Sequence, residues 1–380
     1  MSKKFYSDLK LGVLGGGQLG RMFIQDALNF NLNILVLDPD PEAPCKNIAN
    51  EFTVGDLLDF ETVYQFGKKV DLITIEIEHV NIEALEALEK EGVIVFPQPR
   101  VLRIVQDKGL QKNFYKENGI ATADYFLVDN KKDIADFTTH FPFMQKLRKG
   151  GYDGKGVTKL HDTSNFDHAF DAPSVLEKFV DFEKEISVIV ARNSQGEIKT
   201  YPLVELDFNP EANLVEFLFS PANVAADIET KAAEIAIHVA EALKIVGILA
   251  VEMFLTKSGE ILVNEIAPRP HNSGHHSIEA NYTSQYEQHL RAILNLPLGA
   301  TSISSAAVMV NLLGEKEHYG NVVYAGLEEV LAMEGVKLHL YGKKTTKPFR
   351  KMGHITVLGK TLQEAKEKAI IVKDKLKAIS

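Results

Sequence analysis

A glycine-rich loop between an apolar run and a helical pattern constrains the fold of this chain more than any other feature. The segment LGVLGGGQLG, residues 11–20, places Gly15, Gly17 and Gly20 in the spacing G-x-G-x-x-G. These residues suit a strand that turns tightly into a helix and offers backbone N–H groups to a phosphate. A second apolar run, NILVLD, ends at Asp38. Together they predict a strand, a helix and a parallel strand.

The first hundred residues continue this alternation of short apolar runs and helical patterns. The sequence FPQPR, at residues 96–100, predicts a domain boundary, because two prolines in four residues interrupt helices and strands. We therefore expect a Rossmann-like first domain over residues 1–100, with a doubly wound parallel sheet. Its strands are expected over 11–14, 33–38, 71–76 and 93–96, and its helices over 18–30 and 81–91.

The rest of the chain has a different pattern. A helix is expected over residues 101–118 and a longer one over 228–243, with strands and turns between them. This order favours an antiparallel α+β domain over residues 101–295. Short β-like runs and a final helix rich in Lys and Glu predict a small, β-rich third domain over residues 296–380.

Composition limits the classes of function. The formal net charge of the 380 residues is −10, whereas nucleic-acid binding usually requires a basic face, so no nucleic-acid partner is expected. The single cysteine, Cys45, allows no internal disulfide. No signal peptide is evident, and no run approaches the roughly 20 apolar residues of a membrane helix. We expect a cytoplasmic protein without a membrane partner.

Two glutamates occur in a predicted β-hairpin. The apolar runs 250–255 and 261–265 flank a turn, and centring that turn on residues 258–259 places Glu252 opposite Glu265. Cross-strand neighbours have Cβ atoms roughly 4.5–5.5 Å apart, so two like charges there need compensation. Mg²⁺ would provide it, because it binds through one or two carboxylates together with substrate phosphates. The alternative is a pair of exposed glutamates on the solvent face of the hairpin.

The register of this hairpin is open in two respects. A bulged turn would shift the pairing by one residue and weaken the metal site. Strict alternation along the strand would also turn Asn264 away from Glu265. Both side chains can line one site only if the strand ends or bulges at that point.

A second glycine-rich segment, KGGYDGKG at residues 149–156, has four glycines in eight residues. Its backbone N–H groups and Lys155 could surround a phosphate, and Lys146 lies just upstream on an expected strand. It lacks the Gly-Lys-Ser/Thr ending of a Walker loop, so that chemistry is not implied. The alternative is an ordinary mobile hairpin on the surface.

Taken in order, these motifs resemble the ATP-grasp superfamily. The strings GGGQLGRM, TIEIEHV, GGYDGKG, NEIAPRPHNSGH and FRKMGH are together similar to the family of 5-(carboxyamino)imidazole ribonucleotide synthases of purine biosynthesis. The resemblance covers residues 11–356. It implies an ATP-grasp fold, ATP and magnesium as cofactors, and a homodimer. It further implies carboxylation of aminoimidazole ribonucleotide with bicarbonate, through carboxyphosphate, giving ADP and phosphate.

The resemblance also implies roles for the matching residues. Glu252 and Glu265 would bind magnesium. Residues 177–180 would lie beside adenine, and Glu185 would hold the ribose hydroxyls. The full set implied to bind ATP is Lys108, Lys146, Gly150, Gly151, Tyr152, Asp153, Gly154, Lys155, Gly156, Glu177, Lys178, Phe179, Val180, Glu185, Asn264 and Glu265. The set implied to bind the ribonucleotide is Gly17, Gln18, Leu19, Glu76, His79, Arg269, His271, His275, Lys343, Arg350 and Lys351. The residues implied in catalysis are Tyr152, Asp153 and Arg269.

One segment departs from the family pattern. After YPLVE, at residues 201–205, the chain has Leu206 and Phe208 where the family usually has polar residues, so no ATP contact is assigned there. Several site residues also have simpler interpretations. His271 and His275 could cap turns, and Glu76 and His79 could begin a helix. The three basic residues near the end of the chain could form a solvated surface: Lys343, Arg350 and Lys351.

Three other functions are compatible with parts of the sequence. A nicotinamide oxidoreductase would explain the first glycine loop and Asp38, but not the paired glutamates. Another ATP-grasp ligase, such as a formate-using glycinamide ribonucleotide transformylase, would share most motifs; a biotin carboxylase fits this length less well. A non-catalytic sensor would bind ATP without turnover, which the intact acidic pair argues against.

Overall fold

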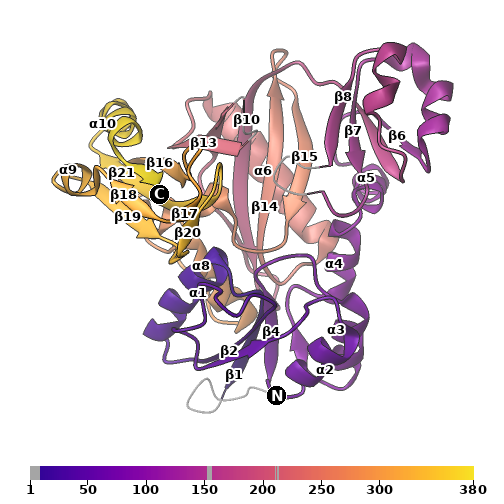
Figure 1. Cartoon of the computed structure of the whole chain (residues 1–380). Coiled ribbons are helices and arrows are strands. Elements are labelled where there is room, and N and C mark those ends of the chain that lie inside the picture. Colours follow the sequence, from indigo (N-terminus) through magenta and orange to yellow (C-terminus); the bar gives the residue numbers. More distant parts are fainter. Residues whose placement is uncertain (1–8, 152–155, 210, 212–213) are drawn as a thin grey trace.

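The computed structural model describes residues 9–151, 156–209, 211 and 214–380 (Figure 1). The predicted parallel sheet is confirmed, with strand order β3-β2-β1-β4-β5. Helix α1 packs on one face together with α8, whereas α2 and α3 pack on the other. Strand β3 and helix α2 were not predicted. The bounds are β1 (Lys10–Leu14), α1 (Gln18–Asn29), β2 (Asn33–Asp38), β3 (Glu51–Val54), α2 (Phe60–Gly67), β4 (Leu72–Ile75), α3 (Ile82–Lys90), β5 (Ile94–Val95) and α8 (Gln285–Ile293).

Two helices occupy the region where one was expected. Helix α4 (Pro99–Val105) ends before Asp107, and α5 (Lys108–Glu117) begins after it. The Asp107 side chain accepts hydrogen bonds from the backbone N–H groups of Gly109 and Leu110, at 2.8 and 3.2 Å, and so caps a new helix. The prediction of one continuous helix over 101–118 is therefore wrong. The break places Lys108 in the first turn of α5.

A small antiparallel sheet follows, with strand order β6-β9-β7-β8. Its apolar core includes Phe143 and Leu176. The hairpin of β7 and β8 carries the second glycine-rich segment, of which residues 152–155 lie outside the described residues. The bounds are β6 (Tyr125–Val128), η1 (Lys131–His140), β7 (Phe143–Leu147), β8 (Val157–Leu160), η2 (Thr163–His168) and β9 (Ser174–Lys178).

The largest sheet has the order β15-β14-β10-β12-β13-β16-β21-β19, with β11 paired to β10. Helix α6 covers one face of β10 and β14, and α8 packs against the other. The bounds are β10 (Phe182–Arg192), β11 (Ile198–Thr200), β12 (Val204–Asn209), β13 (Leu214–Ser220), α6 (Ala226–Leu243), β14 (Gly247–Thr256), β15 (Ile261–Ala267), η3 (Asn272–Gly274), α7 (Ser277–Ala280), β16 (Ala306–Leu313), β19 (Val336–Leu340) and β21 (Lys351–Gly359).

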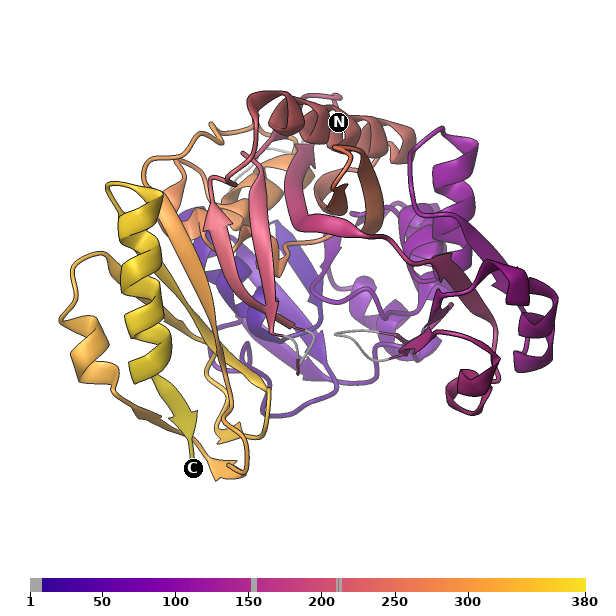
Figure 2. The same ribbon diagram turned by 90° about the horizontal axis from the view of Figure 1, so that it is seen from above.

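Strands β16, β21 and β19 continue this sheet, whereas β17 pairs with β20 and β18 with β22 in two separate small sheets; α10 packs on β16 and β21. The domain boundaries at residues 100 and 295 stay predictions. The small sheet and the C-terminal part lie on opposite sides of the molecule (Figure 2), and the parallel sheet lies below both of them in the view of Figure 1. None of the described helices has the length and apolar content needed to cross a bilayer. The remaining elements are β17 (Gly320–Asn321), β18 (Val323–Ala325), α9 (Leu327–Leu331), β20 (Thr345–Thr346), α10 (Leu362–Lys375) and β22 (Lys377–Ile379).

A buried histidine joins the parallel sheet to the large sheet. The backbone N–H of Ile248 on β14 donates to His289 Nδ1 at 3.2 Å, so the ring proton is on Nε2, which lies 2.8 Å from Thr74 Oγ1 on β4. Burial lowers the pKa of His289 to about 3 and that of His276 to about 4. It also lowers the pKa of His275 and His354. These four rings are therefore neutral in the folded protein near pH 6.

We predict that acid destabilises the fold through these histidines. Below pH 6.5 the unfolded chain binds protons at these histidines that the folded chain does not, so their contribution to the free energy of unfolding falls as pH falls. Each histidine contributes up to about 1.4 kcal/mol per pH unit. Denaturant titrations at pH 7, 6 and 5 measure this slope. His289→Gln, which can keep both hydrogen bonds, should reduce the number of protons taken up on unfolding by about one and so make the slope shallower. An unchanged slope would contradict a neutral, buried His289.

Candidate active site

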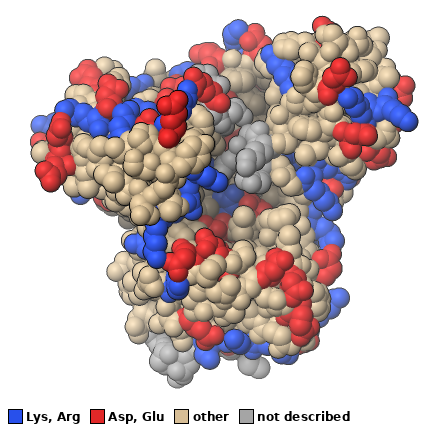
Figure 3. Space-filling view, in the orientation of Figure 1, with Lys and Arg blue, Asp and Glu red and all other residues tan. Residues whose placement is uncertain are grey.

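The predicted site residues come from all three parts of the molecule and meet between them. The space-filling view is hollowed where the three parts come together, and Lys and Arg side chains lie in and around this hollow (Figure 3). Local positive charge of this kind explains how a chain with a formal net charge of −10 can bind anions.

The hairpin of β14 and β15 does place Glu252 opposite Glu265, as predicted, but by a different register. Thr256 N donates to Glu260 O at 2.9 Å, and Gly259 has φ of 82°, so the turn has three residues and a left-handed glycine. This shifts the pairing by one residue. A bulge beyond Met253 shifts it back, with Asn264 as the extra residue.

Charge is distributed unequally over the two glutamates. Lys108 Nζ lies 2.7 Å from Glu265 Oε2, and its charge lowers the pKa of Glu265 to about 2. Burial and the negative charge of Glu265 raise the pKa of Glu252 to about 8. The Glu265 side chain is 44% exposed and Glu252 14%. A cation beside both groups would favour the ionised form of Glu252.

This donor set fits magnesium completed by phosphate oxygens. The bulge brings Asn264 into the site, where its Oδ1 accepts from Lys146 Nζ at 3.0 Å. Two carboxylates and an amide oxygen are ligands that a hard divalent ion accepts. Among the described residues, no group of three or more His, Cys, Asp or Glu could hold a metal alone. A bound ion would therefore need further oxygens, such as those of ATP.

Two lysines share one buried glutamate beside the hairpin. Lys146 Nζ lies 2.8 Å from Glu177 Oε2, and Lys112 Nζ lies 3.3 Å from Glu177 Oε1. Burial raises the pKa of Glu177, but the two lysines lower it more, so it is ionised. The sequence interpretation missed Lys112. Its spacing of four residues from Lys108 on α5 is the signal that could have found it, because such residues share a helix face.

The proposed adenine strip follows this glutamate. Lys178 ends β9, and Phe179 is 44% exposed, with Lys159 Nζ 4.1 Å from its ring centre. Val180 follows in sequence. Glu185 lies on β10 opposite Phe254, and burial raises its pKa to about 7. Gly150, Gly151 and Gly156 are the described glycines of the second glycine-rich segment, whereas Tyr152, Asp153, Gly154 and Lys155 lie outside the described residues.

The first glycine loop is already occupied by acidic side chains. Glu76 Oε1 accepts from Leu19 N at 3.0 Å, and Asp38 Oδ2 accepts from Gly16 N at 2.6 Å. A Cβ on Gly17 would lie 2.5 Å from Glu76 Oε1, so the carboxylate fills the space over the loop. In this structure the Leu19 N–H group is therefore bound to Glu76, and a contact of Leu19 with the ribonucleotide stays a prediction. These contacts also oppose a pyrophosphate at this loop.

The other predicted ribonucleotide residues lie in the first and third parts of the chain. Lys343 Nζ donates to Gln18 Oε1 at 2.8 Å and to Lys351 O at 2.7 Å. Arg350 Nη1 donates to Thr345 O at 2.8 Å. The His79 side chain, after β4, is exposed. The structure thus brings Lys343, from the third part of the chain, to the first glycine loop.

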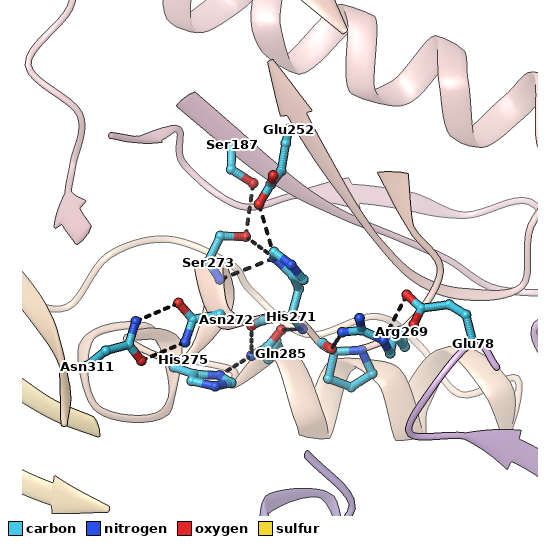
Figure 4. Close-up of polar contacts among 11 residues, drawn as sticks. Glu78, Ser187, Glu252, Arg269, His271, Asn272, Ser273, His275, Gln285 and Asn311 are labelled. Atoms are coloured by element: carbon cyan, nitrogen blue, oxygen red, sulfur yellow. Dashed lines mark hydrogen bonds and ion pairs between the residues drawn. The ribbon is translucent and has the colours of Figure 1, made fainter. Parts of the chain in front are cut away.

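The segment 269–275 carries the remaining predicted residues (Figure 4). Arg269 Nε lies 2.9 Å from Glu78 Oε1, a partner that the sequence interpretation missed. His271 Nδ1 lies 3.6 Å from Glu252 Oε1. His275 differs, because it is 1% exposed and its Nδ1 lies 3.1 Å from Gln285 Nε2 and 3.2 Å from the Tyr286 hydroxyl. The structure therefore places the His275 side chain in the interior, behind the surface of the site.

Three known domain families match the chain in sequence order. Residues 9–106 match the ribonucleotide synthetase preATP-grasp domain, residues 113–286 the ATP-grasp domain, and residues 307–368 the phosphoribosylaminoimidazole carboxylase C-terminal domain.

Curated relatives match nearly the whole chain. The N5-carboxyaminoimidazole ribonucleotide synthase of Bacillus subtilis is 38% identical over 367 residues, which cover 94% of each chain. A chloroplastic phosphoribosylaminoimidazole carboxylase of Vigna aconitifolia is 39% identical over 374 residues, covering 96% of this chain and 67% of that protein.

Solved structures show the same fold. The N5-carboxyaminoimidazole ribonucleotide synthetase of Thermotoga maritima has a TM-score of 0.90 at 47% identity, covering 98% of this chain and 99% of the other. The N5-carboxyaminoimidazole synthase of Aspergillus clavatus, in complex with ADP and 5-aminoimidazole ribonucleotide, has a TM-score of 0.89 at 34% identity. That alignment covers 98% of this chain and 100% of the other.

Proposed function

The chain belongs to the family of N5-carboxyaminoimidazole ribonucleotide synthases, and we infer that it carboxylates 5-aminoimidazole ribonucleotide with bicarbonate and ATP in purine biosynthesis. The product has a new bond between the exocyclic nitrogen and the carboxyl carbon, and ADP and phosphate are released. The single observation that supports this chemistry best is the facing pair Glu252 and Glu265, with Lys108 and Lys146 beside it.

The chemistry divides into three steps. A bicarbonate oxygen attacks the γ-phosphorus of ATP, and the bond to the ADP oxygen breaks, giving carboxyphosphate. Carboxyphosphate separates into CO₂ and phosphate. The exocyclic amine then attacks CO₂ and loses a proton. Because water would hydrolyse carboxyphosphate, the site has to exclude it.

We propose how the residues of this chain divide the work. Glu252 and Glu265, with Asn264, would hold magnesium, which neutralises charge on the phosphates when bound. Lys146 would contact the same phosphates from β7, with Glu177 fixing its direction. Lys108 would turn from Glu265 toward phosphate once a cation takes its place. Phosphoryl transfer depends mainly on such positioning and charge.

The phosphate of the ribonucleotide would be bound by basic residues from the third part of the chain, namely Lys343, Arg350 and Lys351. Arg269, already paired with Glu78, would face the reacting end of the substrate. Tyr152 and Asp153 remain proposed catalytic residues. The homodimer and the cytoplasmic location stay predictions.

An ADP-release assay with separate co-substrates tests this function. ADP release should require both bicarbonate and aminoimidazole ribonucleotide for full rate. Release that depends instead on formate and glycinamide ribonucleotide would favour the transformylase. A fluorescence titration with NADH tests the alternative that the protein is an oxidoreductase. We expect no binding of NADH, because Glu76 and Asp38 occupy the first glycine loop.

Arg350→Ala should mainly weaken ribonucleotide binding. Loss of one charged contact to a phosphate costs about 1.5–3 kcal/mol, so KM for the ribonucleotide should rise about tenfold or more with kcat little changed. Steady-state kinetics measures both constants. The exposed Lys347, changed to Ala, is the matched control and should leave KM unchanged. A normal KM with a lost kcat would assign Arg350 a different role.

A further inference from the structure

A fully buried glutamine supports the segment that carries His271. Gln285 is the first residue of α8 and is 0% exposed. Its Oε1 accepts from the backbone N–H of His271 at 2.8 Å, and its Nε2 donates to the backbone carbonyl of His271 at 2.8 Å (Figure 4). One side chain therefore binds both polar backbone groups of a single residue, which fixes the direction of that residue.

The surroundings of Gln285 are shaped to keep this contact. A Cβ on Gly274 would lie 2.4 Å from Gln285 Oε1, so only glycine leaves room for the carboxamide. Two more contacts, one buried and one partly buried, hold the same segment. Ser187 Oγ on β10 donates to Ser273 Oγ at 2.9 Å, and Asn272 and Asn311 exchange side-chain hydrogen bonds at 2.9 and 3.0 Å. The segment is thus anchored to β10, β16 and α8.

The residue that Gln285 holds faces the acidic pair. His271 Nδ1 lies 3.6 Å from Glu252 Oε1 and 3.0 Å from Ser273 Oγ. A change in the backbone of His271 would therefore move its ring relative to Glu252. It would also move Arg269, two residues earlier, relative to Glu78.

We propose that Gln285 is a positioning residue for the carboxylation, which holds His271 and Arg269 at the angle that the ribonucleotide requires. This inference rests on the proposed function of the site. Gln285 itself is buried and touches no substrate; it acts through the two hydrogen bonds to His271. Small displacements of reacting groups can cost about a hundredfold in rate, so these bonds should affect kinetics beyond their effect on stability.

The chain contains a matched control on the same helix. Gln288 is also 0% exposed, and it makes the same two bonds to another residue: Gly299 N donates to its Oε1 at 2.7 Å, and its Nε2 donates to Gly299 O at 3.0 Å. Gly299 belongs to none of the proposed binding sets. Replacing either glutamine by methionine removes such a pair of hydrogen bonds from the interior, and Gln285→Met also removes the 3.1 Å contact of Nε2 with His275 Nδ1.

The test compares Gln285→Met, Gln285→Glu and Gln288→Met by thermal unfolding and steady-state kinetics. Both methionine variants should lose stability, and Gln285→Met should lose somewhat more because it also gives up the contact with His275. Gln285→Met should raise KM for the ribonucleotide about tenfold and lower kcat about tenfold or more, with KM for ATP within about twofold of the parent. Gln288→Met should keep the parent kinetics. Gln285→Glu keeps the acceptor for His271 N–H and should be intermediate.

Kinetic constants of Gln285→Met equal to those of Gln288→Met would overturn the inference. If Gln285→Met does not fold, Gln285→Glu decides, because it preserves the shape and one of the two bonds; parent kinetics in that variant would likewise overturn it. Failure of the proposed function is separate, since the unmodified protein would then show no ADP release dependent on bicarbonate and ribonucleotide.

Discussion

Glu252→Gln is expected to lower kcat about a hundredfold or more while leaving the fold intact. Phosphoryl transfer depends on charge neutralisation, and removing a single stabilising group from such a site typically costs about 10²–10³ in rate. The substitution removes one of two negative ligands from the proposed magnesium site. It is isosteric with protonated Glu252, the form that burial and Glu265 favour without metal, so the metal-free fold should tolerate it.

The measurement is steady-state turnover over a range of magnesium concentrations. Glu260→Gln is the matched control, because Glu260 lies on the same hairpin with an exposed side chain, and its kcat should stay at the parent value. Near-normal turnover of Glu252→Gln at ordinary magnesium levels would remove this residue from the metal site.

Lys146→Met should lower kcat/KM for ATP about a hundredfold or more, with KM for the ribonucleotide little changed. The lysine contacts both Glu177 and Asn264, so its ammonium group lies between the proposed adenine strip and the metal site. Losing a preorganised positive charge at a transferring phosphate has an effect of this size. Glu177 keeps its second partner, Lys112, so the buried carboxylate is not left without a cation.

Lys132→Met provides the comparison for Lys146→Met. Lys132 belongs to the same part of the chain as Lys146, with an exposed side chain, and its loss should leave both constants unchanged. Equal loss of activity in the two variants would indicate a general effect on the small sheet. A Lys146→Met variant with normal KM and kcat for ATP would exclude the phosphate contact.

The acidic pair could be predicted because pairing rules for a hairpin depend on local sequence. The register by which the two strands reach that pairing could not be predicted. Its three-residue turn shifts the register, and the bulge at Asn264 shifts it back. At the bulge, Asn264 Oδ1 accepts a hydrogen bond from Lys146, which lies in a different sheet and 118 positions away in sequence. Hairpin periodicity contains no information about such a contact.

Other differences have the same long-range origin. The break before α5 follows from the Asp107 cap, and Asp107 also binds Arg148 through two bonds of 2.8 Å. His275 was expected at the ligand, but its place is set by Gln285 and Tyr286 on a helix that covers the large sheet.

The first glycine loop shows the limit of a local motif most clearly. Its spacing satisfies the dinucleotide pattern, and Asp38 follows where that pattern has an acid. In the fold, however, Glu76 from the end of β4 and Asp38 both bind the loop backbone. Only the arrangement of neighbouring strands brings Glu76 there, so the motif alone could not exclude a dinucleotide.

The central claim, that bicarbonate is phosphorylated by ATP, is tested most directly by following its oxygen. Bicarbonate labelled with ¹⁸O should transfer one labelled oxygen to the phosphate released in a rapid single turnover with aminoimidazole ribonucleotide, because the bond between phosphorus and that oxygen survives the breakdown of carboxyphosphate. ³¹P NMR detects the label. Carboxylated product accompanied by unlabelled phosphate would contradict the account.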